Sequence, residues 1–307
     1  MRSDEQIREG LAILAMPVLL LSVEIGAVLL AMPMMASGYA VFEDPKSLQN
    51  PIWFIAMLLA FTAFLLILIK YRWRRALDWI IRISLFIAYI YVFSGLLVLV
   101  MPAFVGLVLG AVSAALAMLL LWKYPEWYVV DILGVFLAAG VASMFGISLE
   151  PFPVILLLFL LAVYDALAVY KTRHMITLAQ GVIEGRMPIM VVVPKKEGYS
   201  FIRDGVGGSI ESSGIHDEGD RHDRGAYLMG LGDLIMPAIL VTSAAMFLPG
   251  EGFGIFSMPA IGTMLGSLVG LAFLLGRVRS GRPQAGLPPL NGGAILGFLI
   301  GWYLMIQ

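Results

Sequence analysis

The chain has 307 residues, a net charge of -1 and no cysteine; 60% of its residues are hydrophobic and only 13% are charged. This composition excludes an ordinary soluble domain, in which about a quarter of the residues are charged. The missing cysteines exclude disulfides, thiol catalysis and cysteine metal sites.

Apolar runs of about 20 residues recur along the whole length, which predicts an all-α polytopic membrane protein. We expect one membrane-embedded domain over residues 1–307, with six transmembrane helices within 10–171 and three within 225–306. The one long connector covers 172–224. The nine expected spans are 10–33, 51–70, 79–100, 103–122, 127–147, 151–171, 225–247, 253–276 and 289–306.

The distribution of positive charge predicts the orientation of these helices. Of the 20 lysine and arginine residues, only Lys46 lies on one side; the others lie in the N-terminal tail or in and beside the even-numbered connectors. Because positive connectors are retained in the cytoplasm, we expect a cytoplasmic N-terminus, a cytoplasmic 172–224 connector and an external C-terminus. The first apolar run has no cleavage site of small residues at the right distance, so we expect it to be a retained helix.

The long connector contains one segment with a different pattern. Residues 189–193 are apolar and mostly β-branched and lie between two prolines, which predicts a short strand. Val191 and Val193 are candidates for binding an unwound substrate by strand addition. The alternative is a short strand with a merely local partner.

Two aspartates lie within apolar runs, Asp165 in the sixth span and Asp233 in the seventh. An ionisable group at membrane depth costs about 2.5–3.5 kcal/mol even on lenient insertion scales, and it normally faces a partner inside the protein. At 1.5 Å per helical residue, the two acids lie about 9 Å and about 13 Å from the same surface. Their similar depth predicts a pair; the alternative is two unrelated polar residues with separate partners.

The residues around these acids form recognisable motifs. Tyr164 precedes the first acid, and Gly230, Leu231 and Gly232 precede the second. Glycine allows close approach of another backbone. The Tyr-Asp pair and the Gly-Leu-Gly-Asp string, on consecutive spans, resemble the presenilin and signal peptide peptidase family of intramembrane aspartyl proteases.

A third motif extends the resemblance to the last span. The family has a Pro-Ala-Leu sequence at the start of its ninth span, and here Pro288, Pro289 and Leu290 stand at that position, so the middle residue departs from the pattern. The resemblance implies nine spans, a cytoplasmic N-terminus and catalytic aspartates at Asp165 and Asp233. Short external connectors and the lack of cysteine fit a lean member from a microbial cell membrane.

The resemblance also implies the chemistry and the substrates. Two neighbouring carboxyl groups cannot both ionise easily, so the dyad is expected to share one proton and to activate a water without any cofactor. The expected substrates are transmembrane peptides in the lipid bilayer, such as signal peptides or membrane stubs. One alternative is a proton- or cation-coupled transporter or channel that uses the same two acids. Another is a Gly-x-Gly-Asp peptidase of the prepilin-processing type, which would have fewer spans.

Other polar and small residues have structural interpretations. Glu24 and Asp131 carry no motif and are expected to pair helices or to lie near a surface. No histidine spacing indicates a metal site, and no basic patch with interleaved aromatic residues indicates a nucleic-acid partner. Glycines recur every four residues in the last two spans, which indicates close helix packing inside the molecule or between copies in a homo-oligomer.

Overall fold

The chain is mostly helical in the computed structural model. Among the residues that the structure describes, seven helices are long and apolar enough to cross a membrane, and two shorter apolar helices accompany them. The described part also contains two antiparallel sheets of two strands each. The prediction of a polytopic helical membrane protein is therefore confirmed. The structure describes residues 2–71, 73–98, 100–167, 190–194, 199–204, 226–250, 252–278 and 285–307.

Helices form most of the described chain, and short strands lie between some of them. The helices are α1 (Arg2–Ala36), α2 (Gln49–Lys70), α3 (Arg74–Leu97), α4 (Ala103–Lys123), α5 (Trp127–Ser148), α6 (Pro151–Leu167), α8 (Phe201–Asp204), α9 (Leu231–Phe247), α10 (Met258–Val278) and α11 (Leu287–Ile306). The strands are β1 (Met190–Pro194), β2 (Ala226–Gly230), β3 (Gly252–Phe253) and β4 (Phe256–Ser257).

The predicted seventh span is wrong at its start. Residues 226–230 form strand β2, and helix α9 begins only at Leu231. Over so few residues, apolar character does not distinguish a buried strand from a helix, and pairing with β1 decides the conformation. The predicted strand is present as β1, one residue later than expected; Ile189 lies outside the described residues. The eighth span also starts late, at Met258, because the β3–β4 hairpin precedes it.

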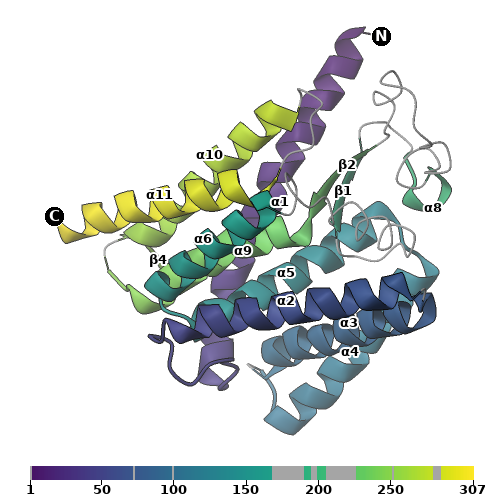
Figure 1. Cartoon of the computed structure of the whole chain (residues 1–307), viewed down its shortest axis with the longest axis horizontal. Coiled ribbons are helices and arrows are strands. Elements are labelled where there is room, and N and C mark those ends of the chain that lie inside the picture. The colour runs from purple at the N-terminus through teal and green to yellow at the C-terminus, as the bar shows by residue number, and fades with distance from the viewer. Residues whose placement is uncertain are drawn as a thin grey trace.

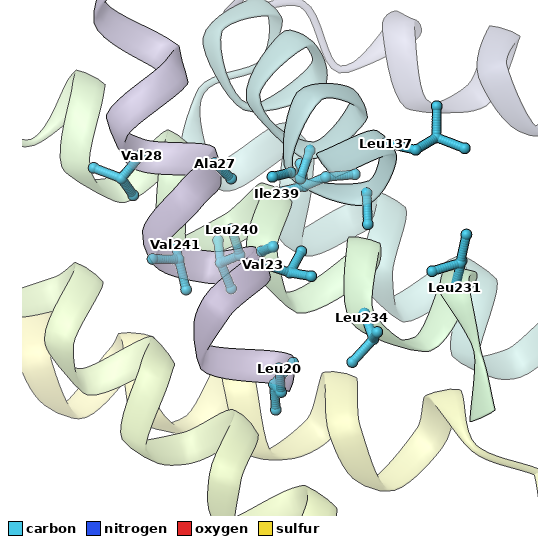
Figure 2. Packing of buried hydrophobic residues seen from close by; sticks show 14 of the residues in the cluster. Leu20, Val23, Ala27, Val28, Leu137, Leu231, Leu234, Ile239, Leu240 and Val241 are labelled. Carbon is cyan, nitrogen blue, oxygen red and sulfur yellow. The ribbon is translucent and has the colours of Figure 1, made fainter. Parts of the chain in front are cut away.

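Helix α9 lies at the centre of the molecule, where it contacts α1, α5, α6, α10 and α11 (Figure 1). All its residues from 237 to 245 are buried. Figure 2 shows Leu240 and Val241 of α9 beside Val23 of α1 within the apolar core. In a membrane an apolar helix can face either lipid or protein, but the small side chains among the buried residues of α9 allow neighbouring helices to pack closely around it. The first turn of this central helix carries Asp233.

Helices α10 and α11 lie side by side and meet along two rows of glycine (Figure 1). A Cβ added at Gly266 would overlap the carbonyl oxygen of Gly293, and one added at Gly262 would overlap that of Gly297. Two helix backbones can approach this closely only when no side chain separates them. Of the two alternatives that the spacing left open, the glycines therefore serve packing inside the molecule.

Candidate active site

Asp165 and Asp233 both lie at the N-terminal end of α11. The backbone N–H of Leu287 donates a hydrogen bond of 3.1 Å to Asp165 Oδ2. The preceding residue, Gly286, lies against the other acid, because a Cβ added there would be 2.7 Å from Asp233 Oδ2. The two carboxyl groups are also near enough to interact electrostatically. The structure thus brings both predicted acids to one short stretch of backbone.

Three helices position these groups. Asp165 lies near the C-terminal end of α6 and is only 4% exposed, whereas Asp233 lies in the first turn of α9 and is partly exposed. Helix α6 packs against both α9 and α11. Asn291, on the second turn of α11, donates from Nδ2 to the carbonyl oxygen of Leu158 at 3.0 Å, which ties α11 to the helix of Asp165.

The two prolines of the third motif determine which backbone donors the start of α11 presents. The first N–H groups of a helix have no partner inside it, but Pro288 and Pro289 have no N–H. The N–H of Leu287 is the first-turn donor that reaches the site, and Asp165 accepts it. Leu290 is fully buried in the core and anchors the start of this helix.

Of the three motif residues before Asp233, Gly230 and Leu231 lie close to other side chains or to other glycines, and Gly232 borders open space. Gly230 ends β2, and a Cβ added there would be 3.8 Å from Asp233 Oδ2. Leu231 is buried and packs towards Gly134 of α5. Gly232 is exposed, and an added Cβ would meet no atom within 4 Å. Tyr164 is half-buried, and its hydroxyl forms no hydrogen bond with any residue that the structure describes.

The sheet of β1 and β2 leads directly into the site, because β2 ends three residues before Asp233. Val191 and Val193 of β1 are buried and pair with Met229 and Tyr227 of β2. Strand β1 also contacts α5 and α1. The predicted strand therefore has its partner at the entrance to helix α9.

Sequence reasoning missed some of these residues and undervalued others. Gly286 and Leu287 carried no motif of their own, although they directly precede one. Asp131 was expected only to pair helices or to lie near a surface, yet its Oδ1 accepts the backbone N–H of Val192 at 2.8 Å. Asn291, a polar residue within an apolar run, was a signal that could have been used. Within the described ranges, no group of three or more His, Asp or Glu side chains could hold a metal ion.

Comparisons with known proteins identify the family to which this fold belongs. A family model described as signal-peptide peptidase, presenilin aspartyl protease matches residues 16–306. A structure of a presenilin family intramembrane aspartate protease in space group C222 is similar at 44% sequence identity and a TM-score of 0.69, covering 95% of this chain and 99% of that chain. A second structure, in space group P2, is similar at 46% identity and a TM-score of 0.67, covering 95% and 97%. A search of curated proteins finds no match.

These matches support the protease interpretation and not the transporter or channel alternative. They also confirm the resemblance drawn from the sequence motifs. Because the family match runs over nearly all of its length, the chain belongs to the signal-peptide peptidase and presenilin family of intramembrane aspartyl proteases.

Proposed function

We propose that Asp165 and Asp233 are the catalytic dyad of this protease. The observation that carries the proposal is that Gly286 and Leu287, consecutive in the chain, contact one carboxyl group each. A short backbone stretch that touches both acids restrains the distance between them. Such restraint is what two groups need if they are to act together on one water and one peptide carbonyl.

The chemistry follows from two carboxyl groups in a poorly solvated place. They share one proton and titrate as a pair. The ionised member takes a proton from the attacking water, and the protonated member donates a hydrogen bond to the carbonyl oxygen of the substrate. The proton then passes to the leaving nitrogen as the peptide bond breaks. This step consumes one water and requires no cofactor.

The neighbouring motif residues support the dyad in this proposal. Pro288, Pro289 and Leu290 start and anchor the helix whose first N–H reaches Asp165. Gly230 and Leu231 carry the chain from β2 into α9. The open space at Gly232 leaves room for a substrate backbone beside Asp233, and Tyr164 belongs to the same group of supporting residues on the side of Asp165.

The substrates in this proposal are single-span transmembrane segments, such as signal peptides or membrane stubs. A helical segment hides its peptide bonds within its own hydrogen bonds, so it must unwind before it is cut. The two-stranded sheet can hold the unwound segment by strand addition. Val191 and Val193, which were predicted to bind that segment themselves, pair with Met229 and Tyr227 of β2, so in this arrangement they support the sheet to which the substrate adds.

We also propose the number of membrane spans and the side of the membrane on which each terminus lies. The seven long helices and two shorter apolar helices correspond to nine spans of one membrane-embedded domain. The positive charges place the N-terminus and the 172–224 connector in the cytoplasm and the C-terminus outside. The host is a microbial cell, and no nucleic-acid partner takes part. A homo-oligomer would need a surface other than the glycine rows, which α10 and α11 use between themselves.

The dyad is tested with purified protein and a single-span peptide substrate. Asp165→Asn and Asp233→Asn keep the size of each side chain but remove the titrating group, so each variant is expected to lose at least about a thousandfold in cleavage rate. Mass spectrometry of the products measures the rate. Thermal unfolding in the same detergent shows that the variants are folded.

The matched control is Glu24→Gln, which changes another buried carboxyl group that lies outside the proposed site and accepts a hydrogen bond from Ser267. This variant is expected to keep its cleavage activity. Substantial cleavage by a folded Asp165→Asn or Asp233→Asn variant would show that the dyad is assigned to the wrong residues.

A further inference from the structure

The hydrogen bond between Asp131 and Val192 closes one edge of the β1–β2 sheet. In an antiparallel pair, residues alternate between those that bond to the partner strand and those whose backbone groups point outward. The N–H of Val192 bonds to Asp131 Oδ1 at 2.8 Å, so it points away from β2. Val192 is paired with Leu228, and the backbone groups of Leu228 therefore point to the opposite, outer edge of β2.

Asp131 is firmly held in this position. Its side chain is buried, it lies in the second turn of α5, and that helix packs along β1. One turn earlier, Glu126 accepts hydrogen bonds from Ser200 Oγ at 2.6 Å and from the N–H of Phe201 at 3.0 Å. Val192, Phe201 and Ala226 form a small apolar cluster beside these contacts. Asp131 and Glu126, at the start of α5, thus hold strand β1 and the start of α8 in place by hydrogen bonds.

The two edges of the sheet differ in what they offer to an unwound peptide. An open strand edge binds any extended chain through its row of N–H and C=O groups. On β1 the central donor is already used by Asp131. On β2 the outward groups of Leu228 have no hydrogen-bond partner among the described residues, and β2 runs through Gly230 to Asp233.

We propose that Asp131 is a positioning residue that closes the β1 edge, so that an unwound transmembrane substrate adds only to the edge of β2, in one register relative to Asp233. This inference rests on the proposed proteolytic function and deepens it, because it names the residue that limits where the substrate is cut. A strand that could add to either edge would present different peptide bonds to the dyad. Asp131 acts on the reaction through the backbone of Val192 and does not touch the reacting atoms.

The first test removes the hydrogen bond between Asp131 and Val192, first by changing the acceptor and then by changing the donor. Asp131→Ala removes the acceptor, and Val192→Pro removes the donor while leaving intact the N–H groups that face β2. In full-length purified protein, each variant is expected to spread cleavage of a single-span substrate over additional positions, as read by mass spectrometry of the products. Asp131→Asn keeps an acceptor oxygen and is expected to restore the wild-type pattern. The double variant is expected to show no more spreading than either single variant, because both remove the same bond.

Two comparison variants separate positioning from general damage. Val191→Pro removes an N–H that bonds to β2, so it is expected to reduce total cleavage rather than to spread it. Glu24→Ala removes a buried carboxyl group far along the sequence from the sheet, and it is expected to lower thermal stability while leaving the cleavage positions unchanged.

Hydrogen exchange of the peptide covering 190–194 supplies a readout that does not depend on activity. Asp131→Ala is expected to raise exchange of this segment by about tenfold, as the loss of one buried hydrogen bond predicts. The inference would be overturned if Asp131→Ala showed both wild-type exchange and wild-type cleavage positions. If Asp131→Ala does not fold, the same two measurements on Val192→Pro decide whether the β1 edge is closed by this bond. Absence of any product from the wild-type chain would instead overturn the proposed function, while exchange would still decide whether Asp131 closes the edge.

Discussion

At Gly286, the lack of a side chain leaves room for the carboxyl group of Asp233. A Cβ at this position would lie 2.7 Å from Asp233 Oδ2, which is closer than real Cβ atoms pack, and 3.0 Å from its Cγ. The acids themselves were predictable from sequence, because an ionisable residue inside an apolar run is costly and therefore conspicuous. Gly286 was not, because its role depends on a contact between segments that lie far apart in the chain.

Gly286→Ala is expected to reduce cleavage by about tenfold or more, because the added methyl group must displace Asp233 from its position beside Asp165. The protein should remain folded, since Gly286 lies at the end of a helix and only a side chain must move. Initial rates with a single-span substrate measure the effect. Gly276→Ala is the matched control, because an added Cβ there meets no atom within 4 Å; equal rates for the two variants would contradict the steric argument.

At the scale of elements, the sequence predicted nearly every helix, and its errors have a local physical cause. The apolar residues of β2 have the same character as those of α9, and only the partner strand β1 shows that they form a ladder. Likewise, the glycine rows of α10 and α11 predicted close packing but not the identity of the partner helix. The spacing of glycines along one helix shows which face of that helix packs closely, but which helix packs against that face depends on the fold of the whole chain.

Gly266→Ala is expected to lower the free energy of unfolding by about 1–3 kcal/mol, because the new methyl group would overlap the carbonyl oxygen of Gly293 and push α10 and α11 apart. Thermal unfolding in detergent measures the change. Gly292→Ala, on α11, serves as the control, since an added Cβ there meets nothing within 4 Å. A fall in stability as large for Gly292→Ala would show that the glycine contact is not the cause.

At the scale of the whole molecule, the absence of native cysteine makes the proposed orientation directly testable. Lys46→Cys and Arg75→Cys each place one thiol at an exposed position, on opposite sides of the membrane in the proposed topology. A membrane-impermeant maleimide is expected to label Lys46→Cys in intact cells and Arg75→Cys only after the cells are opened. The reverse pattern, or equal labelling of both, would overturn the orientation drawn from the positive charges.

The hydrogen bond between Leu287 and Asp165 joins positions that lie 122 residues apart. Because translation runs from the N-terminus to the C-terminus, both aspartates are made before the backbone of Gly286 and Leu287 that contacts them. The proposed dyad is therefore incomplete in any growing chain in which α11 has not yet been made and packed.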